Sequence, residues 1–151
     1  MIESEPRGLY FEEFVPGQSV ESPARVVTEA DVMQFAELSG DHNPLHVDAE
    51  FAKQTPYGQR IAHGLLGLSI ASGLAEGFLR GTALAFTGLT WKFKAPIFFG
   101  DAIHLRATVS KTRALPAMGG GMVVMDVAVL NQHGKVAQEG EWMVLVKSRP
   151  Q

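Results

Sequence analysis

The sequence predicts an α+β protein in which an antiparallel sheet packs against one long buried helix. Two observations carry this prediction. A largely apolar segment runs from His63 to Leu79, and the chain after it changes from helical spacing to strict alternation of apolar and polar residues. Such alternation is typical of strands with one face on a core and one in water. A buried helix followed by strands with short turns is typical of this class.

Length and composition indicate one folded unit. The chain has 151 residues, of which 46% are hydrophobic and 19% charged, enough for a substantial core. We therefore expect residues 1–151 to form a single domain. A net charge of −3 argues against nucleic-acid binding. The absence of cysteine excludes disulfides, zinc–thiolate sites and cysteine nucleophiles.

The first third of the chain predicts short elements. Residues 19–28 are expected to be extended, and Thr28 is a natural N-cap for a helix that ends at Gly40. A second short helix is expected after Asp48. The acidic N-terminus has none of the features of a secretory signal, so a cytoplasmic protein is expected.

The apolar segment His63–Leu79 has the length of a long helix but contains four glycines, two serines and Glu76, so it does not predict a membrane span. Glycine lowers helix propensity by roughly 1 kcal/mol relative to alanine. We therefore expect other parts of the chain to pack closely against these glycines, which are Gly64, Gly67, Gly73 and Gly77. The predicted structure is a central helix enclosed by the sheet.

The second half of the chain predicts four strands, the first two from strict alternation. They cover residues 89–94, 103–110, 122–130 and 136–147, with a loop over 115–121. In the first of these strands Leu89, Trp91 and Phe93 are expected to face the core. Lys92, Lys94 and Arg106 fall on the opposite, polar phase, where a solvated sheet face explains them as well as an anionic ligand does.

The segment GDHNPLH, residues 40–46, concentrates groups that could carry chemistry. A carboxylate, Asp41, and an imidazole, His46, lie five residues apart on a turn stiffened by Asn43 and Pro44. Two such groups can hold a water molecule between them, which general acid–base chemistry requires. The alternatives are that Asp41 only forms an Asx turn and that His46 is a core histidine.

GDHNPLH, followed by IAHGLLGLSIAS and WKFKAPIFFGD, resembles the MaoC-like family of (R)-specific enoyl-CoA hydratases and 3-hydroxyacyl dehydratases. The resemblance spans about residues 35–145 and implies a hotdog fold, a sheet wrapped round one long helix. It implies that Asp41 and His46 are the catalytic pair and that the Gly64 N–H polarises the thioester. It also implies that Asn43 and Ser72 are substrate-binding residues.

This resemblance further implies reversible hydration of a trans-2-enoyl-CoA to the (R)-3-hydroxyacyl-CoA, without a separate cofactor because the coenzyme A thioester is the substrate. It implies a homodimer or larger homo-oligomer whose sheets pair edge to edge. No metal is expected, since His42, His104 and His133 have no metal-ligand spacing. Two alternatives stay open: a hotdog acyl-CoA thioesterase and a non-enzymatic acyl-thioester-binding subunit.

Overall fold

The computed structural model describes residues 6–151, so the first five residues of the predicted domain lie outside the described part of the chain. The elements follow in this order: η1 (Phe11–Glu13), β1 (Ser19–Glu21), β2 (Arg25–Val26), α1 (Glu29–Ser39), α2 (Pro44–Val47), α3 (Ala49–Lys53), α4 (Gly64–Leu74), α5 (Glu76–Leu79), β3 (Ala83–Phe93), β4 (Ala102–Leu115), η2 (Pro116–Met118), β5 (Gly120–Leu130) and β6 (Val136–Lys147).

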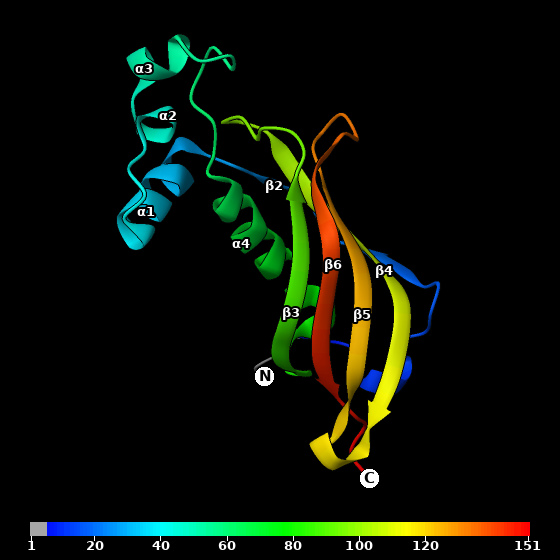
Figure 1. Ribbon diagram of the computed structural model, residues 1–151. Coiled ribbons are helices and arrows are strands. Elements are labelled where there is room, and N and C mark those ends of the chain that lie inside the picture. The colour runs from blue at the N-terminus through cyan, green and yellow to red at the C-terminus, as the bar shows by residue number, and fades with distance from the viewer. Residues whose placement is uncertain (1–5) are drawn as a thin grey trace, which may run out of the picture.

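The strands form one antiparallel sheet in the order β1-β4-β5-β6-β3, and β2 pairs with β4 (Figure 1). The prediction of an α+β protein with four long strands after the helix is therefore confirmed. Connections between β4, β5 and β6 are short, as antiparallel neighbours allow. β3 pairs with β6, the last strand, and so lies at the edge of the sheet.

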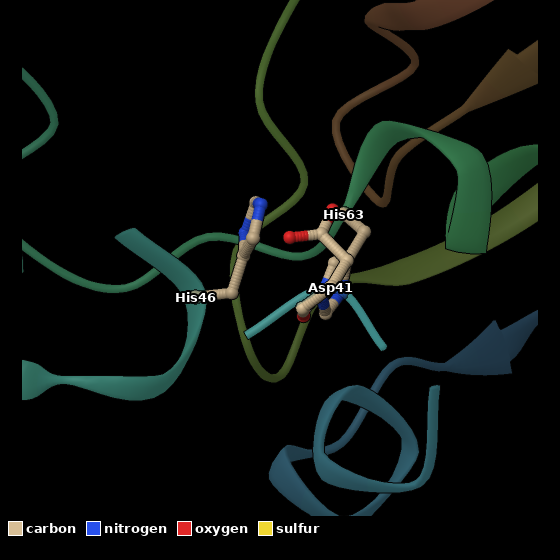
Figure 2. Close-up of side chains that lie close together, drawn as sticks. All are labelled: Asp41, His46 and His63. Atoms are coloured by element: carbon tan, nitrogen blue, oxygen red, sulfur yellow. The ribbon is translucent and has the colours of Figure 1, made fainter. Parts of the chain in front are cut away.

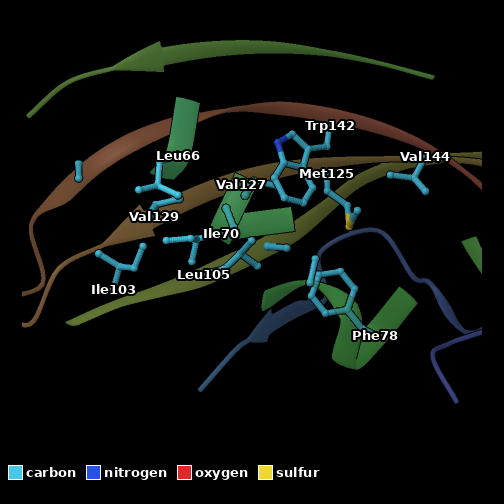
Figure 3. Packing of buried hydrophobic residues seen from close by; sticks show 14 of the residues in the cluster. Leu66, Ile70, Phe78, Ile103, Leu105, Met125, Val127, Val129, Trp142 and Val144 are labelled. Atoms are coloured by element: carbon cyan, nitrogen blue, oxygen red, sulfur yellow. The ribbon is translucent and has the colours of Figure 1, made fainter. Parts of the chain in front are cut away.

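Helices α4 and α5 supply the helical side of the core. Leu66 and Ile70 of α4 and Phe78 of α5 are buried with apolar side chains of the sheet (Figure 3). The sheet contributes Ile103 and Leu105, on the phase that alternation predicts for that strand, together with Met125, Val127, Val129, Trp142 and Val144. The predicted continuous helix is interrupted at Ala75, which separates α4 from α5. No helix among the described residues is long and apolar enough to cross a membrane.

Capping at the N-terminal helices follows the sequence prediction. The Thr28 hydroxyl accepts a hydrogen bond from the Asp31 N–H (3.1 Å), and Gly40 ends α1 in the left-handed conformation with φ 80°. The Asp48 carboxylate caps α3. The segment GDHNPLH is less simple than the predicted turn, because its second half forms the short helix α2.

β3 is the main departure from the predicted core. Leu89, Trp91 and Phe93 stand opposite Trp142, Gly140 and Gln138, so they do lie on the helix-facing side of the sheet. However, Leu89 and Phe93 are 41% and 54% exposed, because β3 is an edge strand that α4 and α5 leave largely uncovered. The prediction of a core position is therefore wrong for Leu89 and Phe93, whereas Trp91 is partly buried and packs against the core.

Two of the four helix-segment glycines are sites of close packing. A Cβ at Gly64 would lie 2.7 Å from the Phe93 ring, and one at Gly67 would collide with the Gln138 amide and lie 2.8 Å from Ile97. By contrast, a Cβ at Gly73 or Gly77 would meet nothing within 4 Å. The predicted close approach is therefore correct at the first two positions and wrong at the other two.

This difference predicts opposite effects on stability at two positions of the same helix. Gly67→Ala should lower the free energy of unfolding by about 1–3 kcal/mol, because the added methyl overpacks the Gln138 contact. Gly73→Ala should raise it by about 0.5–1 kcal/mol, because helix propensity improves in open space. Melting temperatures of the two variants test this, and equal shifts would contradict the packing described.

Candidate active site

Local hydrogen bonds place Asp41 at the exit of α1. The Ser39 hydroxyl donates to the Phe35 carbonyl (2.7 Å) and accepts from the Asp41 N–H (3.1 Å), which holds the chain as it leaves Gly40. One Asp41 carboxylate oxygen accepts from the Asn43 N–H (3.1 Å). The Asx turn that the sequence offered as an alternative is thus present, but it uses a single oxygen. The second oxygen has no hydrogen-bond partner in the described chain.

His46 lies on α2 and is buried, with 9% exposure. Its Nδ1 lies 2.8 Å from the Ile61 carbonyl oxygen. Because a carbonyl only accepts, Nδ1 carries the proton in this contact, and Nε2 of the neutral ring keeps a lone pair. The hydrogen bond therefore fixes both the ring orientation and the tautomer that a general base needs.

Asp41 and His46 come together, as predicted (Figure 2). No hydrogen bond joins them in the described structure, yet a carboxylate oxygen of Asp41 and a ring nitrogen of His46 lie within 4.8 Å of each other. Two hydrogen bonds of about 2.8 Å that meet at a tetrahedral water span about 4.6 Å. A separation of at most 4.8 Å is compatible with one bridging water molecule.

Gly64 is the first residue of α4, as predicted, and its N–H has no acceptor within the helix. It shares a pocket of about 410 Å³ with His46. That volume lies in the range of small-molecule sites. The remaining lining is mostly apolar: Tyr57, Ile61, Ala62, Leu65, Phe93, Lys94, Ala95, Pro96, Ile97 and Gln138. A donor at a helix N-terminus in apolar surroundings is suited to a developing negative charge.

Asn43 and Ser72 occupy different surroundings. The Asn43 side chain caps α2 by accepting from the Leu45 N–H (3.1 Å), so its oxygen serves the local fold beside Asp41. Ser72 is exposed and donates to the Ser69 carbonyl (2.6 Å). It is eight residues beyond Gly64 on α4, about 12 Å along the axis, and does not line the pocket. The structure does not bring Ser72 to the other predicted site residues.

His63, the residue before Gly64, also joins the site. It is 2% exposed, and its side chain forms no cap hydrogen bond. Instead His63 Nε2 lies 2.9 Å from the Asp41 carbonyl oxygen, and its ring stacks on His46 with centroids 3.9 Å apart. Burial lowers the pKa of His63, against a smaller raising effect of the Asp41 hydrogen bond.

Asp41, His46 and His63 also form the one group, within residues 6–151, whose atoms are close enough to hold a metal ion. The imidazole lone pairs lie in the ring planes, and these planes are inclined by only 28°. Planes so inclined, with centroids 3.9 Å apart, meet several ångströms beyond the ring edges. A metal ion bound by both rings would have to lie near both planes and only about 2.1 Å from each nitrogen. The stacked rings are thus unsuited to sharing one metal ion.

Sequence reasoning missed Gln138, a buried residue on β6. Its amide nitrogen donates to the Gly64 carbonyl (3.0 Å), and its oxygen accepts from the Trp91 indole (2.9 Å). Its position in the strand could have indicated that Gln138 is buried, because it lies on the same strand phase as the buried Trp142 and Val144. A polar residue at a core position requires partners, and here they include the start of α4.

The basic residues near β3 separate into two groups. Lys94, the residue after β3, lines the pocket, and its Nζ pairs with Glu139 (3.1 Å). Lys92 and Arg106 instead line a larger hollow of about 530 Å³ over the sheet, which contains none of the predicted site residues. We assign the site to the smaller pocket, because that pocket holds His46 and Gly64.

Comparison with known proteins shows similarity over most of the chain. A family model described as a MaoC like domain matches residues 12–129. The chain belongs to the MaoC-like family. The match includes the whole segment that carries Asp41, His46 and Gly64.

Individual MaoC-like relatives are similar over most of the chain. An (R)-specific enoyl-CoA hydratase of Rhodospirillum rubrum is 37% identical over 140 residues, which are 93% of each chain. The structure of an R-hydratase of Pseudomonas aeruginosa matches with a TM-score of 0.79 and 32% identity, covering 94% of this chain and 88% of that one.

The fold itself is also found at low identity. A Mycobacterium tuberculosis protein described as having a double hotdog fold matches with a TM-score of 0.83 and 18% identity, covering 95% of this chain and 45% of that one. The predicted hotdog fold is therefore confirmed.

The lowered pKa of His63 predicts a pH-dependent stability. A histidine with a folded pKa below its unfolded value of about 6.5 binds its proton more readily in the unfolded chain. Stability should therefore fall as pH drops through about 6.5 toward the folded pKa. Between pH 7.5 and 5.5, the melting temperature of the wild type should fall more steeply than that of His63→Gln. Parallel curves for the two proteins would contradict this account of His63.

Proposed function

We propose that this protein is a hydro-lyase that reversibly adds water to a trans-2-enoyl-CoA, giving the (R)-3-hydroxyacyl-CoA. The observation that carries the proposal is the placement of Asp41 and His46 at one-water separation, beside the pocket that also contains the N-terminal residue of α4. The named activity of the Rhodospirillum rubrum relative supports it. The acyl-CoA substrate is part of the proposal.

In this mechanism, the water molecule lies between the Asp41 carboxylate and His46 Nε2. The pair removes one proton as the water oxygen forms a bond to the β-carbon of the enoyl group. The electron pair of the double bond moves onto the thioester oxygen, giving an enolate that the Gly64 N–H stabilises. The pair then returns a proton to the α-carbon, so atoms and charge balance.

The remaining predicted site residues have supporting roles in this proposal. The Asn43 N–H holds one oxygen of the Asp41 carboxylate in place (3.1 Å). Ser72, which the resemblance offered as substrate-binding, can act only at a part of the substrate distant from the reacting carbons, because it lies outside the pocket.

An assay with crotonyl-CoA distinguishes this proposal from the two alternatives. Loss of the conjugated enoyl absorbance without release of free thiol indicates hydration. Release of thiol would instead indicate a thioesterase, in which water attacks the carbonyl carbon. No change with crotonyl-CoA or its longer-chain homologues would contradict an enzymatic role and favour a binding subunit.

Asp41→Asn should reduce kcat/KM for crotonyl-CoA by about 10²–10⁴-fold, the range that general acid–base groups contribute. The amide keeps the shape and hydrogen-bonding capacity of the turn but removes the base, so the melting temperature should change little. Asp126→Asn, an exposed aspartate on β5, is the matched control and should be fully active. A well-folded Asp41→Asn enzyme with near-normal turnover would rule out the mechanism.

We also propose a homodimer that forms through the edge strand β3. Among residues 6–151, no strand pairs with the outer edge of β3, and β3 carries exposed apolar side chains, Leu84, Phe86, Leu89 and Phe93, each more than 40% exposed. Exposed edge strands of this kind promote association with another chain. A second β3 would extend the sheet and cover this face.

Leu89→Lys should therefore weaken the dimer, while Leu38→Lys, at an 85% exposed position of α1, should not. Sedimentation velocity measures both. A wild-type protein that sediments as an active 16.3 kDa monomer would contradict the proposed dimer.

A further inference from the structure

His63 contacts both members of the proposed catalytic pair without belonging to it. Its Nε2–H donates to the Asp41 backbone carbonyl (2.9 Å), and its ring lies against the His46 ring at a centroid distance of 3.9 Å. Phe35 of α1 packs on His63 as well, with ring centroids 4.9 Å apart and planes inclined by 58°. The His63 ring is therefore held between α1 and α2.

Space filling alone does not explain why residue 63 is a polar histidine. Because Nε2 donates to a carbonyl, the neutral ring bears its lone pair on Nδ1, and Nδ1 is buried without any hydrogen-bond partner in the described structure. A phenylalanine would fill the same volume without burying an unpaired nitrogen, which is unfavourable. Within residues 6–151, the Nε2–H bond to Asp41 is the one hydrogen bond that the His63 side chain makes, so this contact explains why an imidazole stands here.

We propose that His63 is a positioning residue, which sets the separation of the Asp41 carboxylate and His46 Nε2 on either side of the reacting water. The inference rests on the proposed function of that pair. The hydrogen bond fixes the backbone of Asp41. The stacking restrains rotation of the His46 ring, which is also held by its contact with the Ile61 carbonyl. His63 also precedes Gly64, so the same side chain anchors the start of α4.

Two substitutions separate the hydrogen bond from the stacking. His63→Phe keeps a ring against His46 but loses the N–H, whereas His63→Gln keeps a donor near Nε2 and loses the ring. His133→Gln, in the exposed turn before β6, is the control. Each variant is compared by kcat and KM for crotonyl-CoA and by its melting temperature.

A misplaced base affects turnover more than substrate binding, so His63→Phe should lower kcat by about 10–100-fold with KM changed by less than about threefold. His63→Gln should recover most of kcat, to within about fivefold of the wild type. A folded His63→Phe enzyme with wild-type kcat would overturn the proposal. Equal losses of kcat in both variants, accompanied by lower melting temperatures, would also overturn it and leave His63 with a structural role.

A measurement on the wild type decides the geometry if either variant fails to fold. Long-range ¹H–¹⁵N spectra of the imidazoles should show His63 as the neutral Nε2–H form from pH 6.5 to 8, and an Nδ1–H form would overturn the proposal. This result is independent of catalysis. Absence of turnover by the wild type would contradict the proposed function alone, whereas an active wild type with unaffected variants would contradict only the role of His63.

Discussion

The hydrogen bond from the buried Gln138 amide to the Gly64 carbonyl fixes the start of α4 against the sheet. Gln138 can occupy this position because residue 67 lacks a side chain, and the Trp91 indole satisfies the amide oxygen. The pocket is built around this contact, since Gly64, Gln138 and Phe93 all line it. A shift of the helix start would move the Gly64 N–H away from the pocket and alter the position of His63, the residue before it.

The main elements of the fold were predictable because they depend on local pattern. Alternating residues on β4 define a buried face from Ile103 to Val109, and the Thr28 cap and Gly40 define the limits of α1. Alternation does not reveal which strand lies at the edge, because β3 and β4 show the same period. The exposure of Leu89 follows from the pairing of β3 with β6, a contact between distant parts of the chain.

The candidate site likewise has a part that local sequence patterns indicate and a part that depends on contacts between distant residues. Asp41 and His46 are five residues apart and lie on the segment between α1 and α3, so a sequence motif could indicate them. His63 reaches Asp41 across 22 residues and Gln138 reaches Gly64 across 74. Strand phase can indicate that Gln138 is buried, but it does not indicate which residues these side chains contact. Ser72 shows the opposite limit: the family resemblance indicated it, whereas its hydroxyl is exposed and bound to its own helix.

The central claim is that Asp41 and His46 act on the same water molecule as one unit. A double-mutant cycle of Asp41→Asn and His46→Ala, measured as kcat/KM for crotonyl-CoA hydration, tests it most directly. Residues that act as a unit have strongly non-additive effects. The account predicts that the double variant is at most about tenfold less active than the more damaged single variant. Losses that multiply, in variants that remain folded, would show that the two groups act independently and would contradict the claim.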